Sequence, residues 1–351
     1  MPISAFDIYR DRKYFLTESE RADLWEAIKR AIQQNTNFIL CTHCDPDADG
    51  IGSELALYTA LVQMGKNAVI LNPDSLPPIL QFMDPEALIR GFDSMSPEDS
   101  KQLLEEAEVI FYLDSGVWKR LEPMTEEISA RAGKLFCIDH HPTDKLLTEG
   151  SVVDEKASST GELIYELLAE LGHPLDERIA YWLYCAIVKD TGSFRFENTN
   201  PKVFKLASEL TRYGAAPNEV YDQLFERNSI SGVLCLGRVL ETLRFAYDNR
   251  VAYISLTRQM LKETGSSLEE TDNFINVIRS IDPVQLCLFF RDLGNGKIKI
   301  SFRSKTKEID VNLLAEKFGG GGHKRASGAL LEGNLEEVID KVVAAAAECF
   351  N

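Results

Sequence analysis

The sequence is short of positive charge, and this deficit limits the ligands that the protein can hold. Its 351 residues include 38 Lys and Arg against 55 Asp and Glu, which gives a net charge of -17. Proteins that hold long nucleic acids usually display a basic surface, because contacts to backbone phosphates dominate their affinity. We therefore expect no long nucleic acid as a partner. Any nucleic-acid substrate is expected to be short and held by local contacts.

Long apolar runs and an ordered set of cysteines are also missing. No stretch reaches the roughly 18 apolar residues of a membrane span, and the first residues lack the pattern of a signal peptide. The seven cysteines form no disulfide framework. Cys41 and Cys44 have CxxC spacing, but Cys41 lies in an apolar run that is typical of a buried strand. We expect a cytoplasmic protein with reduced thiols and no membrane partner.

The sequence does contain an alternation of short apolar runs and amphipathic stretches. Buried strands are predicted at 38–43, 67–71, 109–114 and 134–138. Helices are predicted at 17–34, 53–65, 96–108, 159–171, 177–189 and 201–213. This alternation is typical of an α/β fold whose parallel sheet is covered by helices on both faces. Further strands at 251–257, 284–290 and 297–304, with a hairpin turn at 293–297, predict a smaller second α/β domain.

A chain of this length suits two domains. We predict an N-terminal extension and helix at 1–35, a catalytic domain at 36–213, a linker at 214–235 and a substrate-binding domain at 236–351.

Three of the predicted strands end in acidic residues and histidines. Ligands of open α/β sheets bind outside the carboxyl ends of the strands, so these side chains are expected to meet. Carboxylate oxygen and imidazole nitrogen suit divalent cations, which would also offset the repulsion between crowded carboxylates. A single Asp in such a place is commonly structural. However, four of the five histidines lie in such motif segments, which favours a metal site. These four are His43, His140, His141 and His323.

At these residues the chain resembles the DHH superfamily of phosphoesterases. The segment from His43 to Ser53 matches the first motif, H-x-x-P-D-x-D-x-x-G-S, and Leu113-Asp114-Ser115 resembles the second. Asp139-His140-His141 resembles the third motif, and the segment from Asp190 to Arg195 resembles the fourth. Ser301–Ser304 and Gly319–His323 are similar to motifs of the DHH-associated C-terminal domain. Within the superfamily, the chain most resembles the nanoRNase and pAp-phosphatase group.

The resemblance implies a centre of two manganese ions. It implies that one ion is held by His43, Asp47 and Asp114, and the other by Asp49, Asp114, His140 and Asp190. Asp114 would bridge the ions, His141 would lie next to the scissile phosphate, and Asp139 would orient the site. The candidate catalytic residues are therefore His141, Asp139 and Asp114. The ligand types alone also allow magnesium, zinc or iron.

The glycine run of the second domain has two interpretations. Most glycine runs form flexible turns, but successive backbone N–H groups can also cradle a phosphate, to which an arginine adds a bidentate contact. The resemblance implies that the substrate is bound by Ser301, Arg303, Gly320, Gly321, Gly322 and His323. Arg120 and Arg195 are further candidate phosphate contacts in the first domain.

The implied activity is two-metal hydrolysis of phosphate esters in short RNA or DNA oligonucleotides, or in small nucleotides such as pAp. One alternative is a phosphodiesterase for cyclic dinucleotides or pApA. An alternative of another class is a regulatory module that binds nucleotides without turnover, although all six predicted metal ligands are present. The sequence also allows a homodimer.

Overall fold

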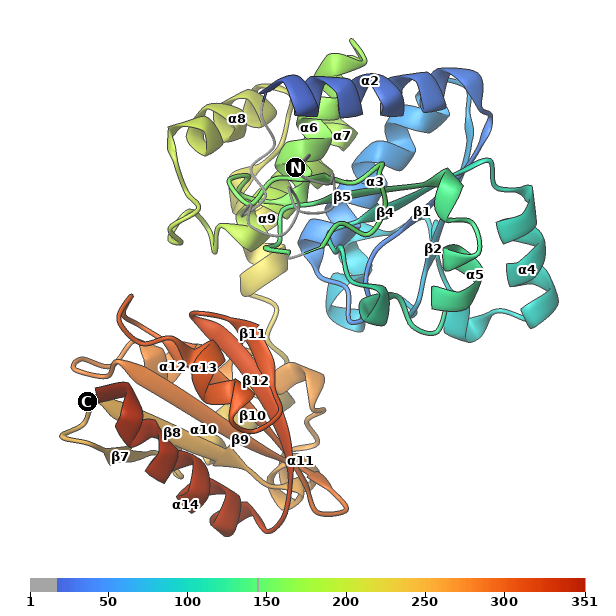
Figure 1. Cartoon of the computed structure of the whole chain (residues 1–351). Helices are drawn as coiled ribbons and strands as arrows, with labels where there is room; N and C mark the ends of the chain where they lie inside the picture. Colours follow the sequence, from blue (N-terminus) through green and yellow to red (C-terminus); the bar gives the residue numbers. More distant parts are fainter. Residues whose placement is uncertain (1–17, 144, 351) are drawn as a thin grey trace, which may run out of the picture. The chain divides into compact units, whose positions relative to one another are not determined.

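The computed structural model describes residues 18–143 and 145–350, apart from the side chains of residues 18–20, 132 and 323. The chain divides into two compact units between Arg227 and Asn228 (Figure 1). This division lies in the segment 214–235, where the sequence predicts a linker. Helices α9 (Pro217–Phe225) and α10 (Ile230–Leu240) occupy most of that segment. Helix α2 is described from Glu18 to Gln34, and Thr17, the first residue of the predicted helix, lies outside the described residues.

The first unit contains a six-stranded, fully parallel sheet in the order β3-β2-β1-β4-β5-β6. Its strands are β1 (Asn37–Cys41), β2 (Asn67–Asn72), β3 (Ile89–Gly91), β4 (Val109–Leu113), β5 (Leu135–Asp139) and β6 (Val152–Val153). The predicted parallel sheet is confirmed, and the two short edge strands β3 and β6 are additional. The strand order reverses between β1 and β4, which is where sheets of this kind bind their ligands.

Helices cover both faces of this sheet, which explains why its central strands are almost continuously apolar. On one face, Phe38, Leu40 and Phe111 pack among helices. These helices are α2, α3 (Ala48–Gln63), α6 (Thr160–Glu170), α7 (Glu177–Asp190), α8 (Pro201–Arg212) and α9. On the other face, Ile39 and Tyr112 pack against α4 (Pro97–Glu106) and α5 (Thr125–Ser129).

Helix α3 begins earlier than the sequence analysis predicts. It starts at Ala48 instead of residue 53, because the Asp47 side chain caps it by accepting a 2.9 Å hydrogen bond from the Asp49 N–H. The prediction was wrong because Gly50 and Gly52 resemble loop residues. As a result, Asp49 lies in the first helical turn, where a negative charge is favoured by the helix dipole.

Gly52 allows α3 and α7 to approach each other closely. A Cβ added at Gly52 would lie 2.5 Å from the carbonyl oxygen of Trp182 and 3.3 Å from the Cβ of Ala186. Backbone atoms of a packed helix cannot move aside easily, so a side chain at this position would push the two helices apart.

We expect Gly52→Ala to lower the free energy of unfolding of the first unit by about 1–3 kcal/mol, the usual cost of overpacking. All three tryptophans (Trp25, Trp118 and Trp182) belong to this unit. Their fluorescence during urea unfolding therefore reports on the first unit. Gly133→Ala is the matched control, because its added Cβ would meet nothing within 4 Å, and it should stay within about 0.5 kcal/mol of the parent. Equal midpoints for both variants would contradict the close helix contact.

The second unit is built on a mixed six-stranded sheet in the order β11-β12-β10-β9-β8-β7. Its strands are β7 (Arg244–Ala246), β8 (Val251–Leu256), β9 (Leu286–Gly294), β10 (Lys297–Ser304), β11 (Gly321–His323) and β12 (Ala326–Glu332). Among the described strands of this second sheet, only β8 and β9 pair in parallel. Helices α13 (Val311–Glu316) and α14 (Leu335–Ala345) pack on one face. Helices α10, α11 (Arg258–Thr264) and α12 (Phe274–Arg279) pack on the other. The predicted second α/β domain is confirmed.

Within the described ranges, the structure contains no helix with the length and apolar character needed to cross a bilayer.

Candidate metal centre

The loops after β1, β4 and β5 bring histidines and an aspartate to one end of the parallel sheet. His43 follows β1, Asp114 follows β4, and His140 and His141 follow β5. Asp114 has a left-handed backbone conformation, with φ 64°, which few non-glycine residues adopt without strain. A 2.9 Å hydrogen bond from its N–H to the carbonyl oxygen of Ile138 holds it there. Its buried carboxylate therefore has a fixed direction at the switch between β1 and β4.

Helices supply the remaining acidic side chains. Asp47 caps α3, Asp49 lies in the first turn of α3, and Asp190 is the last residue of α7. The Asp49 carboxylate accepts hydrogen bonds from the N–H groups of Thr160 (2.7 Å) and Gly161 (2.9 Å) at the start of α6. These contacts use N–H groups that have no partner inside the helix. Asp49 is thus fixed by two helices at once.

The six predicted metal ligands, together with His141, gather into three overlapping groups. In each group, one ligand atom per residue lies within 4.8 Å of the others. The groups are His43 with Asp47 and Asp114, Asp49 with His140 and Asp190, and Asp114 with His140 and His141. Two residues, Asp114 and His140, belong to two groups each. The assignment of these side chains to particular ions stays a prediction.

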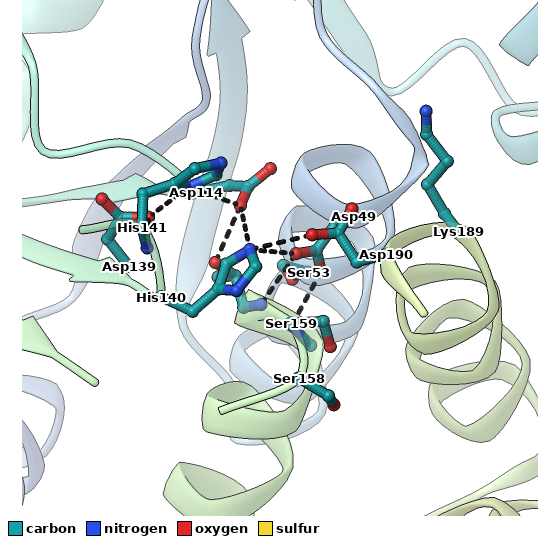
Figure 2. Close-up of polar contacts among 12 residues, drawn as sticks. Asp49, Ser53, Asp114, Asp139, His140, His141, Ser158, Ser159, Lys189 and Asp190 are labelled. Carbon is teal, nitrogen blue, oxygen red and sulfur yellow. Dashed lines mark hydrogen bonds and ion pairs between the residues drawn. The ribbon is translucent and has the colours of Figure 1, made fainter. Parts of the chain in front are cut away.

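The centre of the cluster is the Nε2 atom of His140, and Figure 2 shows its ring facing three carboxylates. Nε2 lies 2.9 Å from Asp190, 3.4 Å from Asp49 and 3.6 Å from Asp114. In the described part of the chain, this buried nitrogen has no hydrogen bond of acceptable geometry. A ring nitrogen among carboxylate oxygens is a donor set that suits a divalent cation, so the residues fit the metal implied by the sequence.

The pKa values of the cluster move in opposite directions. Burial, together with the charges of Asp114 and Asp190, raises the pKa of Asp49 well above its usual value. Burial also acts to raise the pKa of Asp114, but its hydrogen bond to His43 and the charges of His141 and His140 outweigh this effect and lower it. The carboxylates therefore repel one another and share the histidines as their positive partners. A bound cation would reduce this repulsion.

His141 is oriented by its neighbour Asp139. One Asp139 carboxylate oxygen lies 2.8 Å from the Nδ1 atom of His141 and accepts a 3.1 Å hydrogen bond from the His141 N–H. Asp139 is almost fully buried. The contact fixes the ring so that Nε2 lies on the edge opposite Asp139, an arrangement typical of oriented histidines at metal and phosphate sites.

Several residues that hold the site were missed by the sequence analysis. Thr160 donates a 2.9 Å hydrogen bond from Oγ1 to Asp114, and Nζ of Lys189 lies 3.5 Å from Asp47. The spacing of Ser159 and Glu162 could have predicted that a helix begins at Thr160. In the structure the Ser159 side chain caps α6 by accepting a hydrogen bond from the Glu162 N–H. Lys189 gave no such signal, because a lysine in the last turn of a helix is common.

A buried polar chain supports the end of β1. Glu54 accepts a 3.0 Å hydrogen bond from the side-chain amide of Asn72. The side-chain oxygen of Asn72 accepts a 2.9 Å hydrogen bond from the Thr42 N–H. The Thr42 hydroxyl donates a 2.9 Å hydrogen bond to the carbonyl oxygen of Leu113. Burial raises the pKa of Glu54 well above its usual value. The chain links the strand ends that carry His43 and Asp114.

The two arginines proposed as phosphate contacts have different surroundings. Arg195 donates a 2.8 Å hydrogen bond from Nε to the carbonyl oxygen of Gly192. Nη2 of Arg120 lies 2.7 Å from Nδ1 of His43, which is also 2.7 Å from the carbonyl oxygen of Cys44. When Nε2 of a neutral histidine binds a cation, Nδ1 carries the proton and can only donate. In that state His43 would bond to Cys44, and Arg120 would be available to another acceptor.

The predicted substrate-binding residues lie in the second unit. Ser301 in β10 pairs with Gly328 in β12, which pairs with Gly321 in β11. Arg303 stands in the next such row, together with Ala326 and the backbone of His323. Residues directly opposite in a sheet share a face, so both rows lie on one face. Gly320 precedes β11, Gly322 lies within it, and the side chain of His323 lies outside the described part.

Two family models match the chain. Residues 37–187 match the N-terminal domain of the DHH family, and residues 248–351 match the DHHA1 domain. These ranges include the candidate metal ligands, except Asp190, and the paired rows on the sheet of the second unit.

Curated proteins and a solved structure are similar over most of the chain. A bifunctional oligoribonuclease and PAP phosphatase NrnA of Thermus thermophilus is 32% identical over 311 residues, which cover 88% of this chain and 89% of that protein. A protein of the same name from Bacillus subtilis is 30% identical, covering 86% and 91%. The crystal structure of an exopolyphosphatase-related protein from Bacteroides fragilis is 28% identical with a TM-score of 0.89, covering 95% of this chain and 98% of that one.

Proposed function

The chain belongs to the DHH family, and from this premise we propose that it is a two-metal phosphoesterase acting on short oligonucleotides and on small nucleotides such as pAp. One observation carries the proposal. The six predicted metal ligands, which come from the loops after β1, β4 and β5 and from helices α3 and α7, converge at one end of a parallel sheet, and the Nε2 atom of His140 faces three of the carboxylates. The names of the Thermus and Bacillus relatives support the substrate class.

In this proposal two manganese ions share the cluster. His43, Asp47 and Asp114 would hold one ion, and Asp49, Asp114, His140 and Asp190 the other. Such ions lower the pKa of a water and offset charge on the phosphoryl oxygens. The protein's own part is to fix these ligands. Thr160 and the start of α6 hold Asp114 and Asp49, and Lys189 lies beside Asp47.

His141 is proposed to contact the phosphate that is cleaved. Its Nδ1 is held by Asp139, so the ring presents its Nε2 edge in a fixed direction. A protonated or hydrogen-bonding imidazole in this position would stabilise negative charge on a phosphoryl oxygen or on the leaving oxygen. Asp139 then acts through His141 and has no contact with the substrate. Phosphoryl transfer asks for this kind of positioning and charge stabilisation and requires no covalent nucleophile.

The test is product analysis with the purified full chain and manganese. The panel contains pAp, pApA, cyclic di-AMP and RNA from 2 to 20 nucleotides, each with and without a chelator. We expect release of AMP from pAp and pApA that requires the metal. Faster hydrolysis of cyclic di-AMP than of pApA would favour a cyclic-dinucleotide phosphodiesterase. Tight nucleotide binding without any product would instead indicate a regulatory module.

A further inference from the structure

The end of helix α7 places two consecutive side chains at the metal cluster. Oδ2 of Asp190 lies 2.9 Å from Nε2 of His140, and Nζ of Lys189 lies 3.5 Å from Oδ2 of Asp47. Consecutive residues of a helix point in directions about 100° apart. In Figure 2 the Lys189 side chain extends away from the His140 ring, which Asp190 faces. Lys189 therefore lies beside a proposed ligand of one ion, whereas Asp190 is a proposed ligand of the other.

Both carboxylate oxygens of Asp47 have a partner in the structure. Oδ1 accepts the 2.9 Å hydrogen bond from the Asp49 N–H that caps α3, and Oδ2 faces the ammonium group of Lys189. Asp47 also forms the ligand group with His43 and Asp114. Because the cap holds the first turn of α3 in place, Oδ2 is the oxygen that is left for a divalent cation. Lys189 and the cation therefore compete for the same oxygen.

The ammonium group of Lys189 carries a charge that needs an anionic partner. The charge of Asp47 raises the pKa of Lys189, burial acts against this effect, and the charges of Asp190 and Asp114 raise the pKa further. Among the ion pairs of the described residues, Asp47 is the only acidic partner of Lys189. A cation that takes Oδ2 of Asp47 removes this partner and adds a like charge close by. The ammonium group is then left in an unfavourable position.

Lys189 can change its partner. A lysine has a flexible four-carbon stem and three N–H donors on its ammonium group, and the Lys189 side chain is 37% exposed, so packing does not enclose it. The anion that reaches a two-metal centre is the substrate phosphate, whose oxygens accept hydrogen bonds and gather charge during hydrolysis. Lysine binds phosphates as a compact point charge. The substrate can therefore supply the partner that the cation removes.

We propose that Lys189 is a further catalytic residue that exchanges partners: it neutralises Asp47 in the metal-free protein and binds an oxygen of the substrate phosphate once a divalent cation has taken its place. The proposal deepens the function proposed above and rests on it. No covalent bond to Lys189 forms or breaks, because its ammonium group only donates a hydrogen bond to the phosphate oxygen. Lys189 therefore weakens the binding of metal alone and strengthens the binding of metal and phosphate together, which couples the two ligands.

The first test is the manganese affinity of the full chain, measured by calorimetry without nucleotide. Lys189→Met should bind manganese about twofold to fivefold more tightly than the parent, the range for loss of a partly exposed ion pair that competes with the metal. Lys189→Arg keeps the charge and should bind like the parent. A lysine that only held Asp47 in position would have the opposite effect, so equal or weaker manganese binding in Lys189→Met would overturn the exchange.

The second test repeats the titration with AMP, the expected product, after subtraction of the heat of mixing manganese with AMP alone. AMP should raise the manganese affinity of the parent about tenfold more than that of Lys189→Met, the usual effect of a charge-assisted hydrogen bond. Coupling between two ligands is reciprocal, so manganese should strengthen AMP binding by the same factor in each protein. Equal effects of AMP on both proteins would show that Lys189 does not contact the phosphate.

Lys101→Met is the matched control for both titrations. Lys101 lies on α4 and pairs with Glu105 of the same helix. Helix α4 packs on the opposite face of the sheet from α3 and α7. The same charge is thus removed from the same unit away from the cluster, and the affinity for manganese and the effect of AMP should be those of the parent.

Turnover separates this inference from the proposed function. With saturating manganese, kcat/KM for pApA should fall about tenfold in Lys189→Met and recover in part in Lys189→Arg, because the arginine keeps the charge. An unchanged kcat/KM in Lys189→Met would overturn the inference. A parent that binds manganese and AMP but releases no product from pAp or pApA would contradict the proposed function, while the titrations would still decide the role of Lys189. A parent that binds no manganese would overturn both.

Discussion

Replacing Asp114 by asparagine is expected to lower kcat for pApA about a thousandfold or more, close to the loss of a whole catalytic unit. Asp114 belongs to two of the three ligand groups, and no other carboxylate among the described residues does. A neutral amide there would weaken both proposed ion sites together. Asparagine tolerates the left-handed conformation of this residue and can still accept the hydrogen bond from Thr160. The variant should therefore fold.

Stability measurements distinguish loss of metal from loss of fold in this variant. A ligand present at 100 times its dissociation constant stabilises the native state by about 2.7 kcal/mol. Manganese should raise the melting temperature of the parent and raise that of Asp114→Asn much less. Without metal the variant should be somewhat less stable than the parent but still folded, because it loses the attraction to the histidines that lowers the pKa of Asp114.

Asp45→Asn is the matched control for Asp114→Asn. Asp45 is exposed, lies between His43 and Asp47, and also has a positive φ, so the same chemical change is made beside the cluster and not within it. We expect parental activity and full stabilisation by manganese. An Asp114→Asn protein that keeps the parental rate and the full manganese effect would refute the two-metal centre.

A twenty-nucleotide RNA is expected to be hydrolysed with a kcat/KM at least about a hundredfold lower than that of a dinucleotide. The chain has a net charge of -17, so an extended phosphate backbone meets a repulsive field. The substrate contacts predicted around Ser301 and Arg303 can attract one phosphate but not a long strand. Short substrates can make these contacts, and they place fewer phosphates in the repulsive field.

The measurement is a length series of 5′-labelled RNA at several salt concentrations. Salt screens repulsion between exposed charges, so higher ionic strength should narrow the difference between the long and short substrates. A twenty-mer degraded as efficiently as a dimer at low salt would contradict the short-substrate proposal and indicate a processive exonuclease instead.

The parallel sheet could be predicted because strands covered on both faces consist of consecutive apolar residues. The candidate ligands could be predicted because acidic residues and histidines follow these apolar runs. What the sequence did not reveal depends on contacts between distant segments. Gly50 resembles a loop residue, yet a Cβ there would lie 2.3 Å from the Thr42 hydroxyl oxygen, which keeps it glycine inside a helix. Arg291 follows two phenylalanines in an apolar strand. Only the structure shows that this buried arginine pairs with Asp272 and donates a hydrogen bond to Ser301.

The outermost strands of both sheets are very short. β3, β7 and β11 have three residues each, and β6 has two. An edge strand exposes unpaired backbone groups that can recruit a strand from a neighbouring molecule, and brief edges are one way in which proteins prevent this. Two or three residues offer too few hydrogen bonds to template such growth. The protein should therefore resist fibrillar aggregation even when concentrated, and copies that associate would have to meet through helices or loops instead of joining their sheets.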